Sequence, residues 1–156
     1  MRETVNKPID GFEYQIQQLG AKQGKTVMAR MLRIFAPAAE ASDPVARMAA
    51  ALTDAELDFL CDTFAKSTQF SAAAKPEAVL RLSDFFDDHF AGRYGAMVKW
   101  LWACVEVNYG TFLADVGIGP DTIQNLMSGA KMSMTPVNPT NQTGLSGGSS
   151  APVGGG

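Results

Sequence analysis

Hydrophobic and polar residues alternate at the start of the chain. From Phe12 to Leu19, aromatic and aliphatic side chains take every second position at first, with glutamate and glutamine between them. This two-residue repeat predicts a strand that buries one face. The preceding Pro8-Ile9-Asp10-Gly11 has the residue types of a turn, so residues 3–7 are expected to form the other arm of a hairpin.

After this strand the hydrophobic repeat becomes helical. It predicts helices with these approximate bounds: 21–36, 44–52, from 53 onward, from 83 onward, and 94–116. Pro37 is expected to end the first helix, and Thr53 with Glu56 forms a capping box at the start of the third. Ser83 is the predicted cap of the fourth helix, and residues 79–82 before it are expected to form a short strand.

The predicted last helix is apolar on more than one side. One stripe at helical spacing consists of Met97, Leu101, Trp102, Val105, Tyr109, Phe112 and Val116, and a second consists of Trp100, Cys104, Val107 and Thr111. An ordinary surface helix needs only one stripe. Either the helix is central to a bundle, or the second stripe binds a partner through Trp100 and Val107 while Trp102 packs in the core. Lys99 and Glu106 interrupt the apolar run and exclude a membrane span.

The end of the chain has a different composition. From Met132 onward it lacks charged and aromatic residues and is rich in glycine, serine, threonine and proline, which predicts a disordered tail. We therefore expect a domain of residues 1–118 and a flexible tail of residues 119–156, with a short helix at about 120–130. The expected fold class is α+β and mainly helical, with an N-terminal β hairpin followed by a bundle of about four helices.

Composition narrows the classes of partner. The chain of 156 residues is 46% hydrophobic, which is enough for one globular core, and its formal charge is −3. An acidic protein does not attract nucleic acid or an anionic membrane, so we expect neither as a partner. Cys61 and Cys104 lie within apolar helical patterns, which suits a reducing compartment without disulfides. The N-terminus lacks the apolar run of a signal peptide, so a soluble cytoplasmic protein is expected.

Residues 18–32 have the order of a nucleotide-binding P-loop: a strand, a glycine turn, Gly-Lys-Thr and a helix. The Walker pattern places four residues between its first glycine and Gly-Lys-Thr, but only three separate Gly20 from Gly24. A P-loop domain also needs parallel, continuously apolar strands, which the hydrophobic pattern does not predict. We interpret Lys25 and Thr26 as solvated residues in the first turns of a helix, and expect no nucleotide or other cofactor.

The single histidine follows an acidic run. Asp84, Asp87 and Asp88 precede His89, but a second histidine or a cysteine at ligand spacing is missing. We expect a solvated acidic helix surface and no metal site. A cysteine–histidine nucleophile would need His89 beside one of the two cysteines, whose apolar surroundings make a thiol inert. The sequence therefore predicts no catalytic residue and no enzyme.

Two segments carry a resemblance to a known family. The first segment begins with "YQIQQLGAKQG" at Tyr14 and ends with "ARMLRIFAP" at Pro37. The second begins with "FAGRY" at Phe90 and ends with "VEVNYGTF" at Phe112. Together they resemble the tail assembly chaperones of long-tailed bacteriophages. In that family a short β element leads into a helix that ends near a proline, and the last helix has an asparagine–aromatic pair near its end. The resemblance covers about residues 10–116.

The resemblance implies a non-enzymatic chaperone in the cytoplasm of the infected bacterium. It would bind the tape measure protein and help recruit tail tube protein. A frameshifted longer form of the chain is a further expected partner. The chain is also expected to form a homo-oligomer. The adaptable methionines Met28 and Met31 join Trp100 and Val107 as expected partner-binding residues. The alternative is a small structural tail or head-completion protein of the virion.

Overall fold

The computed structural model describes residues 1–115 and Gly117. In chain order the elements are β1 (Thr4–Ile9), β2 (Phe12–Gln17), α1 (Ala21–Ala39), α2 (Pro44–Ala51), α3 (Asp54–Ala65), β3 (Thr68–Ala72), β4 (Lys75–Arg81), α4 (Leu82–Phe90) and α5 (Tyr94–Asp115). The proposed boundary at residue 118, the tail of residues 119–156 and the helix at 120–130 lie outside the described residues. Within the described part, the helices are too short or too polar to cross a membrane.

The strands form one antiparallel sheet in the order β1-β2-β3-β4. The predicted hairpin is confirmed: Ile9 pairs with Phe12, and Asp10 and Gly11 form the two-residue turn with φ angles of 49° and 85°. Both residues have positive φ, as in the turn that best matches strand twist. Residues 79–81 of the predicted strand form the end of β4, whereas Leu82 begins α4 and β3 was not predicted.

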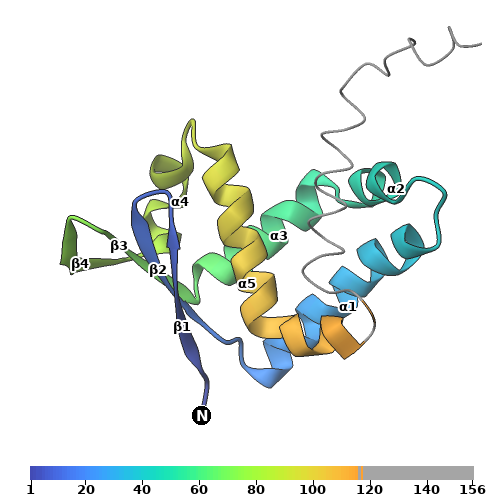
Figure 1. Cartoon of the computed structure of the whole chain (residues 1–156), viewed down its shortest axis with the longest axis horizontal. Helices are drawn as coiled ribbons and strands as arrows, with labels where there is room; N and C mark the ends of the chain where they lie inside the picture. Colours follow the sequence, from blue (N-terminus) through green and yellow to red (C-terminus); the bar gives the residue numbers. More distant parts are fainter. Residues whose placement is uncertain (116, 118–156) are drawn as a thin grey trace, which may run out of the picture.

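The expected helical bundle is therefore wrong. Instead, α3, α4 and α5 pack against a four-stranded sheet, and α1 and α2 pack against each other (Figure 1). Tyr14 and Ile16 of β2 are fully buried against the helices, while Gln15 and Gln17 point to the opposite face. The period-two pattern recognised this half-buried strand, but it could not reveal that β3 and β4, from the middle of the chain, extend the sheet.

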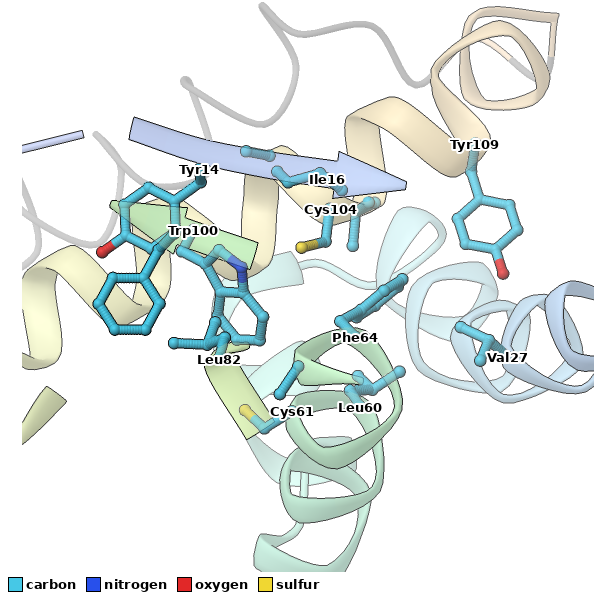
Figure 2. Close-up of a cluster of buried hydrophobic side chains, with 14 of the residues drawn as sticks. Tyr14, Ile16, Val27, Leu60, Cys61, Phe64, Leu82, Trp100, Cys104 and Tyr109 are labelled. Atoms are coloured by element: carbon cyan, nitrogen blue, oxygen red, sulfur yellow. The ribbon is translucent and has the colours of Figure 1, made fainter. Parts of the chain in front are cut away.

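α5 is the helix around which the rest of the fold is arranged (Figure 1). It contacts β1, β2, α3 and α4. Its Trp100 and Cys104 lie among the buried side chains of the core (Figure 2). Two ion pairs join the hairpin to α5, Lys7 to Glu106 at 3.1 Å and Lys99 to Asp10 at 3.0 Å. The two charges that interrupt the apolar run of α5 therefore hold the hairpin.

Two of the predicted helix ends differ from the structure. α1 continues through Pro37 to Ala39, because Ile34 and Ala38 in its C-terminal part are buried and their packing offsets the loss of one backbone hydrogen bond. α4 begins at Leu82, with Arg81 in the cap position. The hydroxyl of Ser83 donates to the Asp84 carboxylate instead of capping the helix.

The capping box of α3 is confirmed in one half. The Thr53 hydroxyl oxygen accepts a hydrogen bond from the Glu56 backbone N–H at 3.3 Å. The Glu56 carboxylate does not bond back to the cap; it pairs with Arg30 of α1 at 3.2 Å. The Arg30 guanidinium also lies 3.8 Å from the centre of the Phe59 ring, so Arg30 connects α1 to α3.

Candidate functional site

A groove opens where the turn from β2 into α1 meets the second half of α5. Its volume is about 400 Å³, within the range of about 300–1,000 Å³ that is typical of binding pockets. The lining residues are Gln18, Leu19, Ala21, Gly24, Lys25, Met28, Asn108, Tyr109 and Phe112. We call this the α1–α5 groove. It lies where the two segments that carry the family resemblance come together.

Side-chain hydrogen bonds of Asn108 and Tyr109 join the two walls of the groove, and a bond within α5 orients the Asn108 side chain. The Asn108 side-chain oxygen accepts from the Leu19 backbone N–H at 2.7 Å, and its amide nitrogen donates to the Cys104 carbonyl oxygen at 2.8 Å. The Tyr109 hydroxyl donates to the Gly24 carbonyl oxygen at 2.8 Å. Figure 2 shows the Tyr109 ring reaching from α5 toward α1. Because both walls are tied, the groove exists before any partner binds.

The groove combines apolar walls with a single positive charge. Burial raises the pKa of Tyr109 to about 12, so its hydroxyl is neutral at physiological pH. Among the residues that line the groove, Lys25 alone is charged. Leu19, Met28 and Phe112 are its large apolar side chains. This surface fits an apolar segment that carries an acidic residue beside it.

Two of the four predicted partner residues lie at or beside the groove. Met28 lines it. Val107 is half-buried, and its carbonyl oxygen accepts a hydrogen bond of 3.4 Å from the Gln18 side chain, which lines the groove. Met31 is only 4% exposed and belongs to the core. Partner binding by Met28 and Val107 stays a prediction.

The predicted orientation of α5 is wrong for its two tryptophans. Trp100, expected on a partner-binding stripe, is fully buried, and its indole N–H donates to the Thr68 hydroxyl oxygen at 3.3 Å. Trp102, expected in the core, is half-buried. Both sides of α5 are apolar, so the hydrophobic pattern could not indicate which side faces the sheet. Trp100 therefore cannot be an exposed partner anchor in this structure.

Sequence analysis missed the residues that build the groove, Leu19, Asn108, Tyr109 and Phe112. Asn108 belongs to the asparagine–aromatic pair of the family resemblance, from which no structural role follows. An asparagine inside an apolar helix is a signal in itself, because its side chain competes for backbone hydrogen bonds and is unfavourable there unless it has partners. The pattern alone could not identify Leu19 as that partner.

The Gly-Lys-Thr segment lies inside α1. Gly20 is the cap residue of the helix and Gly24 already donates to the Gly20 carbonyl oxygen at 2.8 Å. The Thr26 hydroxyl donates to the Lys22 carbonyl oxygen. The Gly24 N–H is therefore used in a helical hydrogen bond, and Lys25 and Thr26 are exposed residues near the start of α1, as the sequence predicts.

His89 belongs to an aromatic cluster. Its Nε2 atom lies 2.6 Å from the Tyr14 hydroxyl, and its ring centre is 4.1 Å from that of Phe70 and 4.7 Å from that of Phe12. Burial, with a smaller effect of the Arg93 charge, lowers the pKa of His89 to about 4. Within residues 1–115, acidic, histidine and cysteine side chains do not gather in threes that could hold a metal ion.

The two cysteines are buried and free. Burial raises the pKa of the Cys61 thiol to about 11 and raises that of Cys104 further. A thiol that stays protonated is a poor nucleophile. Neither cysteine is close enough to His89 for a hydrogen bond among the contacts of the described residues.

Comparison with protein families gives a match over most of the chain. The family model described as "Phage tail assembly chaperone protein, TAC" matches residues 10–119. The matched range includes both walls of the α1–α5 groove. No curated protein and no solved structure matches the chain.

Proposed function

Because the chain belongs to the phage tail assembly chaperone family, we propose that it binds an apolar helical segment of the tape measure protein in the α1–α5 groove during tail assembly. The family implies contact with tail proteins. The tape measure protein as the partner, recruitment of tail tube protein, action in the host bacterial cytoplasm and the absence of enzymatic activity are parts of the proposal.

The observation that carries the proposal is the preformed apolar groove between two hydrogen-bonded walls. A tape measure protein is a long helix with too little core of its own, so it needs a partner that covers its apolar side. Helices of this kind bind by placing their apolar face in a hydrophobic groove. Met28 adds a flexible side chain that adapts to different apolar residues along a repetitive partner.

A matched pair of variants in α1 tests the groove. Met28→Glu puts a carboxylate into the groove, whereas Leu32→Glu puts the same charge one turn further along α1, where the leucine is 39% exposed and outside the groove. Each variant is co-expressed with a tape measure fragment from the same phage and purified through a tag on the chaperone. We expect Met28→Glu to weaken capture at least tenfold and Leu32→Glu to leave it unchanged.

The controls separate this proposal from its alternative. Thermal melts of both variants show whether each is folded. Equal capture by both variants would place the binding surface elsewhere. A wild-type protein that captures no tape measure fragment, but is found by mass spectrometry in purified particles, would instead indicate the small structural tail or head-completion protein.

A further inference from the structure

The first half of α5 exposes large apolar side chains that the groove does not use. Tyr94 is 69% exposed and Val98 is 43% exposed. Leu101 and Trp102, which follow on the same side of the helix, are half-buried. These four residues occupy positions i, i+4, i+7 and i+8, the spacing of one helix face. We call them the α5 patch.

The α5 patch continues the side of α5 that forms the groove. Tyr109 and Phe112, which line the groove, come eleven and fourteen residues after Val98, again at the spacing of one helix side. Val105 lies between the two surfaces and is 5% exposed, so α5 presents one apolar side that is open at its start, covered in the middle and grooved at its end. Leu101, Trp102, Val105, Tyr109 and Phe112 on this side belong to the first apolar stripe that the sequence predicts for the helix.

We propose that one long apolar helix of the partner contacts both surfaces, its two ends lying on the α5 patch and in the α1–α5 groove. The proposal rests on the function proposed above and names the partner more closely. At 1.5 Å per residue, the fourteen residues between Val98 and Phe112 span about 21 Å. A partner helix that covers this span and extends about two turns beyond each end of it needs about 28 residues.

The continuity of the two surfaces is what favours this occupant. Exposed apolar residues that gather on one helix side mark interaction sites, whereas single ones do not. The two surfaces lie on one rigid helix, so a chain bound at one is held near the other and the second contact is made at a high effective concentration. A short ligand would lose this advantage, so length distinguishes the proposed occupant.

Two partner fragments and two α5 variants test the inference. The fragments come from the tape measure protein, one of about 14 residues and one of about 28 residues that contains it. Val98→Glu places a carboxylate in the α5 patch. Thr111→Glu is the matched control, because Thr111 is an exposed residue on another side of the same helix. Binding is measured by calorimetry, after melts confirm that both variants are folded.

We expect the long fragment to bind the wild type at least tenfold more tightly than the short one. Val98→Glu should remove that gain and leave the short fragment within twofold, while Thr111→Glu changes neither affinity. If both fragments bind equally well and Val98→Glu has no effect, the inference is overturned and the groove function stands. If the wild type binds neither fragment, the proposed function fails and the inference fails with it.

Discussion

The hydroxyl of Tyr109 donates a 2.8 Å hydrogen bond to the carbonyl oxygen of Gly24, 85 positions earlier in the chain. This bond joins the second turn of α1 to the second half of α5. A Cβ at position 24 would lie 3.8 Å from the Tyr109 hydroxyl oxygen, so the two helices are already in contact there. The groove is thus built from the first and the last helix of the described chain.

Asn108 provides a direct test of how the groove is held. Asn108→Ala removes the acceptor for the Leu19 N–H and the donor to the Cys104 carbonyl oxygen. Unmade hydrogen bonds of partly buried groups cost about 1–3 kcal/mol, and we expect a loss of this size in the free energy of unfolding, measured with denaturant. Thr111→Ala, at an exposed position, should change it by less than about 0.5 kcal/mol. Equal effects would show that Asn108 does not tie the walls.

The two tryptophans of α5 should differ in their contributions to stability. Trp100→Ala removes a fully buried ring, and truncations of this kind cost about 3–5 kcal/mol. Trp102 is half-buried, so Trp102→Ala should cost clearly less. Denaturant unfolding of both variants measures the difference. A larger loss for Trp102→Ala would contradict the orientation of α5.

The lowered pKa of His89 predicts that the folded protein loses stability in mild acid. Its pKa is about 4 in the folded chain, compared with 6.5 for a free imidazole. The unfolded chain therefore takes up the proton first, and the free energy of unfolding falls as the pH drops from about 6.5 to about 4. Above that window the contribution of His89 is fully present. Thermal melts between pH 7.5 and 4.5 measure this fall.

His89→Gln supplies the comparison for the pH series. Glutamine keeps a polar group that can reach the Tyr14 hydroxyl but does not titrate, and carboxylates titrate alike in both proteins. We expect the melting temperature of the variant to fall less between pH 6.5 and 5. Parallel curves would mean that His89 has an ordinary pKa. It is the single histidine of the chain, so its imidazole NMR signal reports the pKa directly.

The two cysteine thiols should react with a thiol reagent much faster in the unfolded protein than in the folded one. Cys104 is fully buried and Cys61 is 7% exposed, and burial raises the pKa of both thiols. A thiol reagent at pH 8 should therefore react slowly with the native protein, and with both cysteines at once after denaturant is added. Fast reaction of either thiol without denaturant would contradict its burial.

Local sequence determined the elements that depend on near neighbours. The alternation from Phe12 to Gln17 and the Asp10-Gly11 turn specify the hairpin, because strand pairing and turn geometry there involve adjacent residues. Thr53 specifies the start of α3 for the same reason, since its hydroxyl bonds to a backbone N–H three residues away. The family resemblance also followed from the sequence, and the family match confirms it.

Tertiary structure alone decided how these elements are used. The apolar pattern of α5 has two sides of similar strength, so only packing against α4 and Thr68 of β3 could bury Trp100 and leave Val98 open. The same holds for the groove, because the bonds of Asn108 to Leu19 and of Tyr109 to Gly24 join residues more than 80 positions apart. A hydrophobic repeat shows which residues are favoured to be buried. It does not show against which other element each of them packs.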